Sequence, residues 1–409
     1  MRPLDPGLVR AQFPAFAEPS LAGIAHFENA GGSYACAPVV DRLTRFYRAR
    51  KVQPYGPARP TAEAGAEMDE ARDRMAALLG VPPDWLSFGP STTQNSYVLA
   101  QAFREMLAPG EAIVVTDQDH EANSGPWRRL AEAGIEVREW RIDPVTGHLD
   151  PAGLPPLLED GKVRLVAFPH ASNVIAEINP VAEICATIRA AGAWSCVDGV
   201  SYAPHGFPDI GGLGADIYFF SAYKTYGPHQ GLMTVRPELA AALPNQGHWF
   251  NAESPGKRFT PAGPDHAQVA ASAGMADYVD FLHAAHGGAE GDGAARGRAV
   301  HDAMRARETA LLAPLMDWLA ARNDIRLLGP RDAAARAPTV AFAADRPGAS
   351  LAETLAARGI MAGGGDFYAV RPLRAMGIDP AHGVLRVSFT HYTTEAEVDA
   401  LIAALDAVL

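Results

Sequence analysis

The sequence is short of several features that would indicate whole classes of protein. Its 409 residues include only three cysteines, Cys36, Cys185 and Cys196, an odd number at spacings that suit neither a disulfide framework nor a metal site. We therefore expect reduced thiols in a cytoplasmic protein. No stretch approaches the roughly 20 unbroken apolar residues of a membrane span. The first residues, MRPLDPGLVR, carry prolines and charges where a signal peptide has its apolar region.

An excess of positive charge is also lacking. The chain has 35 lysines and arginines against 47 aspartates and glutamates, which gives a formal net charge of −12. This balance disfavours nucleic acid or an anionic membrane as a partner but allows a local cationic site for a small anion. No GK[ST] signature of a nucleotide P-loop occurs, and GGLGAD (211–216) is too short for a dinucleotide fingerprint.

What the first two thirds of the chain does have is an alternation of short apolar runs and amphipathic segments. We predict helices at 61–79, 92–107, 124–133 and 179–191. We predict strands at 111–116, 135–140, 163–169, 193–198, 216–221 and 231–235. Strand and helix in succession indicate parallel strands with covering helices, which is an α/β fold. The turn-rich stretch 147–162 is predicted as a helix followed by a loop.

The pattern changes after about residue 265. A long helix at 294–322 with a candidate bend at Pro314, a helix at 350–358 and a final helix at 393–405 alternate with short strands at 339–344 and 384–392. This order indicates a smaller α+β domain. We therefore predict a large domain over 20–265 and a small domain made of 1–19 and 266–409. The segment 245–266 shows neither the helical nor the strand periodicity of apolar residues, and it is predicted as a loop at a domain or subunit junction.

Four polar groups follow predicted strands or turns, and ligands of open α/β sheets bind beyond the carboxyl ends of strands. Ser91, Thr92 and Thr93 stand at a helix start, where hydroxyls, free N–H groups and the helix dipole suit a phosphate. Plain helix capping is the alternative. His120 follows the strand at 111–116, where a histidine can stack on a flat ring or carry a proton. An exposed loop histidine is the alternative there.

The other two groups are Asp198 and Lys224. Asp198 ends an apolar strand, where a carboxylate needs a partner such as a protonated heterocyclic nitrogen, unless it caps a helix. Lys224 follows the apolar run DIYFF, and burial beside other cations would lower its pKa and make it nucleophilic, unless it is a solvated turn residue. Phosphate cradle, stacking histidine, aspartate and lysine in this order predict a pyridoxal 5′-phosphate (PLP) site.

The blocks that contain these residues resemble those of a known family. They are HFENAGGSYACAPVV (26–40), DHEANSGPW (119–127), FPHASNVIAEINPV (168–181), VDGVSYAPH (197–205), SAYKTYGPHQG (221–231) and LRVSFTHYTTEAEVDAL (385–401). Together they resemble the class V aminotransferase and cysteine desulfurase family of fold-type I PLP enzymes. The resemblance implies a mostly parallel seven-stranded sheet between helices and a smaller α+β domain. It also implies a homodimer with its active sites at the subunit interface.

The resemblance implies a role for each matching residue around the cofactor. Lys224 would form the Schiff base, Asp198 would hold the pyridine nitrogen protonated, and His120 would stack on the ring. The remaining cofactor-binding residues would be Thr92, Thr93 and Ser221 at the phosphate, Asn173 near the phenolic oxygen, and Ser201, which stands where the family has Gln or His.

The substrate side is also implied by the resemblance. Arg386 would pair with the α-carboxylate of a small amino acid, a geometry that suits the guanidinium fork. Asn29 and Tyr368 would lie beside the substrate. Tyr223, Tyr226, His229, Tyr368 and Arg371 are the groups that we expect to influence the choice of reaction.

One departure from the family concerns GGGDFYAVRP (363–372), where cysteine desulfurases carry their catalytic cysteine. No cysteine occurs there, and persulfide formation requires a thiolate. We therefore predict transamination, with a keto acid as a possible acceptor. Cysteine desulfurase-like cleavage of a C–S bond by β-elimination is the alternative within the family. A non-catalytic domain that binds phosphate or PLP is the alternative from another class, and intact Lys224 and Asp198 argue against it.

Overall fold

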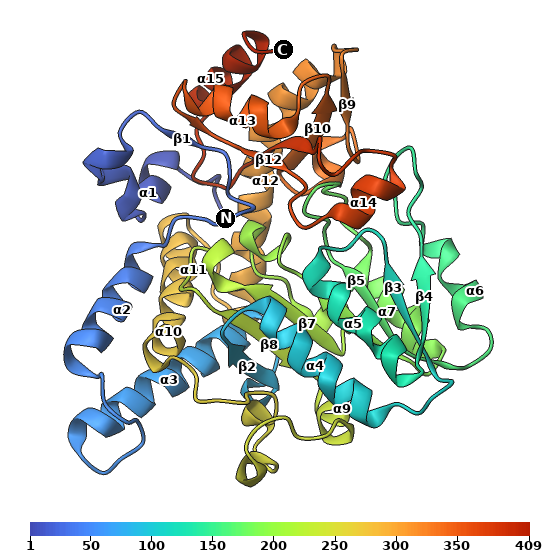
Figure 1. Cartoon of the computed structure of the whole chain (residues 1–409). Coiled ribbons are helices and arrows are strands. Elements are labelled where there is room, and N and C mark those ends of the chain that lie inside the picture. Colours follow the sequence, from blue (N-terminus) through green and yellow to red (C-terminus); the bar gives the residue numbers. More distant parts are fainter.

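The computed structural model describes residues 1–409 and contains three β-sheets, of which one dominates (Figure 1). Its seven strands run in the order β2-β8-β7-β6-β5-β3-β4. Their bounds are Leu86–Gly89 (β2), Ala112–Thr116 (β3), Glu136–Trp140 (β4), Val163–Pro169 (β5), Trp194–Asp198 (β6), Ile217–Ser221 (β7) and Gly231–Val235 (β8). Only β8 is antiparallel to its neighbours. The mostly parallel seven-stranded sheet is thus confirmed.

Six of these strands lie within one residue of their predicted ends, and β2 is the strand that was not predicted. The inner strands are buried on both faces, as in parallel sheets between helices, whereas in the edge strand β4 only Trp140 is buried. Alternate residues of β3 and β5 belong to two separate hydrophobic clusters, one on each face. Helix α4 (Thr92–Met106) covers one face, and α3 (Arg59–Leu78) and α7 (Val181–Ala190) cover the other. All three helices match their predictions.

Two predicted helices are much shorter than expected. The stretch 124–133 forms α5 (Gly125–Arg128) and then a 3-10 turn that ends at Gly134, whose φ of 82° stops the helix. The stretch 147–162 contains only the short helix α6 (Pro155–Leu158), because Pro151, Pro155 and Pro156 leave no room for a longer one. After β8 come α9 (Pro237–Ala242) and the segment 245–266, which has only 3-10 turns, as its lack of period predicts.

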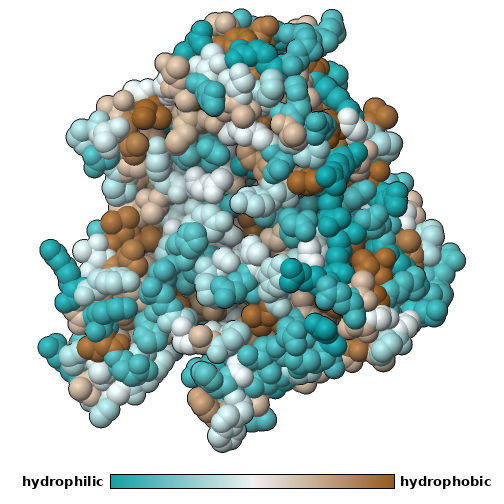
Figure 2. Space-filling model, in the orientation of Figure 1, coloured by the Kyte–Doolittle hydropathy of each residue, from teal (hydrophilic) through white to brown (hydrophobic).

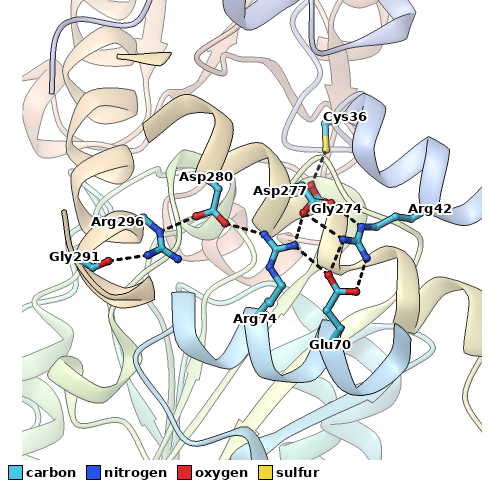
Figure 3. A network of polar contacts seen from close by, with 9 residues as sticks. All are labelled: Cys36, Arg42, Glu70, Arg74, Gly274, Asp277, Asp280, Gly291 and Arg296. Carbon is cyan, nitrogen blue, oxygen red and sulfur yellow. Dashed lines mark hydrogen bonds and ion pairs between the residues drawn. The ribbon is translucent and has the colours of Figure 1, made fainter. Parts of the chain in front are cut away.

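Four further helices frame this layer and were not predicted. They are α1 (Pro6–Arg10), α2 (Ala37–Ala49), α10 (His266–Ala271) and α11 (Ala273–Ala285). A network of ion pairs joins α2, α3, α11 and α12 (Gly293–Ala320) (Figure 3). Arg42 contacts Glu70 at 2.7 Å and Asp277 at 2.6 Å, and Asp280 joins Arg74 to Arg296 at 2.8 Å on each side. The network ties the amino-terminal part of the chain to helices almost 250 residues later in the sequence.

The second sheet has four antiparallel strands in the order β12-β13-β10-β9. They are β9 (Ile325–Leu327), β10 (Thr339–Ala344), β12 (Gly363–Gly365) and β13 (Val384–Ser388), packed with α12, α13 (Gly348–Ala356) and α15 (Glu395–Asp406). Helix α14 (Val370–Ala375) follows β12. A two-stranded sheet pairs β1 (Ala25–His26) with β11 (Ile360–Met361). Thr394 caps α15 in a capping box with Glu397, so this predicted helix start is confirmed.

The predicted strand at 384–392 ends four residues early. The Phe389 N–H turns away to Pro338 O, and Thr390 to Thr393 close a turn. Helix α12 runs through Pro314 without a break. The predicted domain boundary at residue 265 stays a prediction, and α10 and α11, which follow it, pack against α2 and α3.

The outer surface is mostly hydrophilic on the face shown in Figure 2, where hydrophobic residues form small separate patches. None of the helices has both the length and the apolar character that crossing a membrane requires.

Candidate active site

The carboxyl ends of neighbouring strands meet at one edge of the large sheet and open into a cavity of about 530 Å³. Register explains the meeting, because Pro169 of β5 pairs with Asp198 of β6, and Ser221 of β7 pairs with Gly231 of β8. The small sheet closes the other side through Arg386 of β13. Every predicted site residue except Asn29 lines this cavity: Thr92, Thr93, His120, Asn173, Asp198, Ser201, Ser221, Lys224, Tyr368 and Arg386.

Lys224 ends a single 3-10 turn that follows β7, so its amine enters the cavity from the sheet edge. Burial and, to a lesser degree, the charge of Arg386 lower the pKa of Lys224 to about 8, against the opposing effect of Asp198. The pKa of Lys224 is therefore lowered by the two causes that the sequence predicts, burial and a neighbouring cation.

Asp198 is buried at the end of β6, with one oxygen occupied and the other free. Oδ1 accepts the N–H of Val200 at 2.8 Å, and Oδ2 has no hydrogen-bond partner within the chain. Burial raises the pKa of Asp198 to about 6, against the effects of the Val200 N–H and of Lys224. A cationic N–H in the cavity would satisfy Oδ2 and favour the ionised form.

His120 presents a neutral ring to the cavity. Its Nδ1 accepts the N–H of Ala122 at 3.0 Å, which leaves the ring proton on Nε2. Burial lowers the pKa of His120 to about 3, and the charges of Lys224 and Arg386 lower it as well. A neutral flat ring beside two cations suits stacking on a heterocycle better than proton transfer at neutral pH.

The amino end of α4 forms a polar cradle. The Thr92 and Ser221 hydroxyls lie 2.8 Å apart, and the first N–H groups of the helix have no partner within it. Ser91 caps the helix by accepting the Gln94 N–H, so the capping alternative also holds for this residue. A Cβ on Gly231 would lie 2.5 Å from backbone atoms of Ser91 and Thr92, so only glycine lets β8 approach the cradle so closely.

Arg386 is a buried cation without an anion. Its Nη1 donates to the carbonyl of Asn173 at 3.3 Å, its guanidinium carbon lies 3.9 Å from the centre of the Phe367 ring, and its Nε has no partner. Burial lowers the pKa of Arg386 to about 10, and the charge of Glu28 opposes this. Because a buried charge is costly unless it is paired, this guanidinium is prepared for an anionic ligand.

Phe367 and Tyr368 form the loop where the family's cysteine would stand, and both have left-handed backbone angles, φ 53° and 55°. Two hydrogen bonds hold the loop against the cavity. The Phe367 carbonyl accepts from Asn173 Nδ2 at 2.9 Å, and the Tyr368 carbonyl accepts from the Glu121 N–H at 2.9 Å. The Tyr368 side chain is 71% exposed, and its ring centre lies 5.5 Å from that of His120.

No thiol reaches the cavity. Burial raises the pKa of Cys36 to about 12 and that of Cys185 to about 11, and it raises the pKa of Cys196 well above its usual value. None of the three lines the cavity. Since the thiolate is the reactive form, these cysteines are inert in the folded protein.

Asn29 is the predicted site residue that the structure keeps out of the cavity. Its Nδ2 donates to the carbonyls of His26 and Ser388, and its Oδ1 accepts from the Tyr392 hydroxyl. The amide is fully used in joining the amino-terminal segment to β13. Of the other groups expected to influence the reaction, Tyr223 lines the cavity, whereas Tyr226, His229 and Arg371 do not. Glu28, Tyr97 and Phe367 are among the lining residues that sequence reasoning missed, and Glu28 lies inside a quoted family block.

A family model for aminotransferase class-V matches residues 25–260 and 297–401. The chain belongs to this family. Among its relatives, the aminotransferase-like protein FGM3 of Gibberella zeae is 32% identical over 98% of each chain. A cysteine desulfurase of Serratia proteamaculans is 30% identical over 98% of this chain and 97% of its own.

The fold comparison agrees with the family. The solved apo structure of a cysteine desulfurase from Thermococcus onnurineus NA1 matches 100% of this chain and 99% of its own, with a TM-score of 0.86 at 23% identity. This member of the class V aminotransferase family therefore has the fold of the type I PLP enzymes, as the resemblance implies.

Members of the family are PLP-dependent, and the cavity of this chain fits that cofactor. Asn173 Oδ1 and Arg386 Nε are buried without partners, and Asp198 Oδ2 is free. A phosphate would complement the cradle, a pyridine N–H would complement Asp198 Oδ2, a phenolic O–H would complement Asn173 Oδ1, and a carboxylate would complement Arg386. The individual contacts stay predictions.

Proposed function

We propose that this protein is a PLP-dependent enzyme that transfers the amino group of a small amino acid. The observation that supports it is the meeting of a low-pKa amine, Lys224, and an unpaired arginine, Arg386, in one cavity that no cysteine lines. When bound, PLP supplies an aldehyde that condenses with amines and a ring that withdraws electrons from the bonds at Cα.

Each cavity residue of this chain would contact a different part of the cofactor. Thr92, Thr93 and Ser221 would hold the phosphate in the cradle at α4, where the helix dipole favours an anion. Asp198 Oδ2 would accept the ring N–H and keep that nitrogen positively charged, which strengthens electron withdrawal. His120 would cover one face of the ring and exclude water from it.

On the substrate side, Arg386 would bind the α-carboxylate through its free N–H groups and so fix the orientation of Cα. Lys224 Nζ would then take the proton from Cα as a general base, and its conjugate acid would later donate a proton as a general acid. A pKa of about 8 suits both tasks, because a substantial share of the amine is neutral at physiological pH and its conjugate acid still donates readily.

A second candidate is cleavage of a Cβ–S bond by β-elimination. The cysteine desulfurases among the relatives favour it, and elimination needs no protein thiol. Persulfide formation on the protein is poorly supported, because all three cysteines are buried outside the cavity. A non-catalytic PLP-binding domain is poorly supported too, since simple retention of a cofactor requires no unpaired arginine beside it.

A panel of amino acids assayed for keto acid, pyruvate and sulfide would test the proposal. We expect amino-group transfer that requires a keto-acid acceptor, that Lys224→Ala abolishes, and that the control variant Cys185→Ala retains. Sulfide and pyruvate formed from cysteine without an acceptor would contradict transamination and support elimination instead. A yellow cofactor band that no amino acid of the panel perturbs would contradict the enzyme proposal itself.

A further inference from the structure

A glutamate that no role yet accounts for lies beside Arg386 in the cavity. Glu28 follows β1, forms a β-bridge with Ser388 two residues after Arg386, and lines the cavity with a partly exposed side chain. Its carboxylate makes no hydrogen bond and no ion pair within the chain. An unpaired carboxylate at the wall of a ligand site is available to the ligand.

The position of this carboxylate depends on the glycine at 363, which has no side chain. Gly363 of β12 pairs directly with Arg386 of β13, and residues opposite each other in an antiparallel pair project to the same face. A Cβ on Gly363 would lie 2.9 Å from Glu28 Oε1 and 2.7 Å from Cε1 of Phe367. The Glu28 carboxylate and the Phe367 ring therefore fill the space beside Arg386 that a larger residue would take.

The balance of charge in the cavity gives this placement a consequence. Lys224 and Arg386 are its only cationic lining residues, because the His120 ring is neutral. Arg371 lies outside and is paired with Glu121 at 3.2 Å. In the proposed function Lys224 serves the cofactor and Arg386 the α-carboxylate. A second carboxylate on the substrate would find Glu28 and no free cation of the same chain.

We propose that Glu28 determines substrate specificity by rejecting dicarboxylic amino acids and dicarboxylic keto acids. Its carboxylate accepts hydrogen bonds from a side chain that ends in an amide, hydroxyl or ammonium group. The inference rests on the proposed function, because it assigns the α-carboxylate to Arg386. It also restricts the acceptor of a transamination to monocarboxylic keto acids.

The test compares isosteric pairs of ligands that differ only in charge, glutamate with glutamine and aspartate with asparagine. Each is titrated into the PLP-loaded protein, and the change in cofactor absorbance gives an apparent Kd, with calorimetry as a second readout. We expect the wild type to bind the amides at least tenfold more tightly than the acids. Glu28→Gln should reduce this preference at least tenfold, whereas Glu28→Asp, which keeps the charge, should retain most of it.

Equal affinity for acids and amides in the wild type would overturn the inference and leave the proposed function intact. An unchanged preference in a folded, PLP-loaded Glu28→Gln protein would overturn it as well. Failure of every amino acid to bind the loaded wild type would overturn both, because Arg386 would then have no carboxylate to hold.

Discussion

The pKa of Lys224 depends on two charged neighbours in the cavity, Asp198 and Arg386. Burial is the largest cause of the pKa shift of all three residues, and it disfavours the charged form of each. The amine is pushed towards its neutral form by Arg386 and away from it by Asp198. Substitution of either neighbour should therefore shift the pKa of Lys224 in a direction that follows from the charge removed.

The first prediction at this scale concerns the capture of PLP by the apoprotein as a function of pH. Only the neutral amine attacks an aldehyde, so the rate should rise with pH and level off above about 8, the pKa of Lys224. At pH 7.5 about a quarter of such amines are neutral, against roughly 0.1% for an ordinary lysine. Stopped-flow absorbance of the lysine-bound cofactor measures the rate, and a free lysine derivative corrects for the titration of PLP itself.

Two variants provide opposite controls for this profile. Arg386→Met removes a neighbouring cation and should move the midpoint to higher pH, whereas Asp198→Asn removes an anion and should move it to lower pH. A midpoint near 10.5 in the wild type, or shifts of the same sign in both variants, would contradict the arrangement.

How far single residues could be predicted depends on where their contacts come from. Lys224, Asp198, His120 and Thr92 were found because each follows a strand or starts a helix that the sequence pattern marks. Glu28 was missed because its place depends on Gly363, more than 300 residues away, which no local pattern connects to it. The substrate role of Asn29 stays a prediction, although backbone carbonyls that a sequence does not display occupy its amide and keep it out of the cavity.

At the scale of elements, the site depends on how closely a helix approaches a sheet. The start of α4 lies against the first residue of β8, and the absence of a side chain at Gly231 permits this distance. The cradle is therefore a property of a strand and a helix together, held in register by the pairing of Gly231 with Ser221.

Replacement of Gly231 by alanine tests this contact. The new Cβ would lie 2.5 Å from backbone that cannot give way locally, so the amino end of α4 must move. We expect a loss of about 1–3 kcal/mol in the free energy of unfolding and at least a tenfold loss of affinity for PLP. Urea unfolding and equilibrium dialysis measure the two effects.

Gly7→Ala is a suitable control, because Gly7 lies in α1, outside the cavity, and a Cβ there meets only the capping oxygen of Asp5, at 3.2 Å. It should change neither quantity appreciably. Full affinity for PLP in Gly231→Ala would show that the cradle does not need this close approach.

Elements with continuous apolar runs were predicted well, because a strand buried on both faces is mostly apolar along its length. The strand at 384–392 was extended too far, since Phe389 and Tyr392 are apolar but belong to a turn. Helices α2, α10 and α11 were missed. In α10 and α11, small buried residues such as Gly274, which lies against Val39 of α2, give helix contacts without a strong apolar stripe.

At the scale of the whole molecule, one surface is unusual for a single chain. Trp249 is 85% and Phe250 64% exposed, and both lie in the segment 245–266 that was predicted to stand at a junction. Large aromatic side chains in water indicate a contact surface. They support the expected homodimer, in which this segment would meet the second subunit.

Light scattering of the purified protein should give twice the mass of one 43.3 kDa chain. Trp249→Ser combined with Phe250→Ser should shift the equilibrium towards the monomer, because it removes apolar area from the contact. Val145→Ser is the control, since Val145 is 74% exposed in the turn that follows β4 and lies outside the segment. A monomeric wild type at micromolar concentration would contradict the dimer.

The deep burial of all three thiols has a practical consequence for handling this protein. A colorimetric thiol reagent added to the native chain should meet no reactive sulfur, and it should label three per chain after full denaturation. The rate of colour development therefore reports how often the native structure opens enough to expose a cysteine, and no engineered label is needed. For the same reason, purification and storage in air call for no reducing agent.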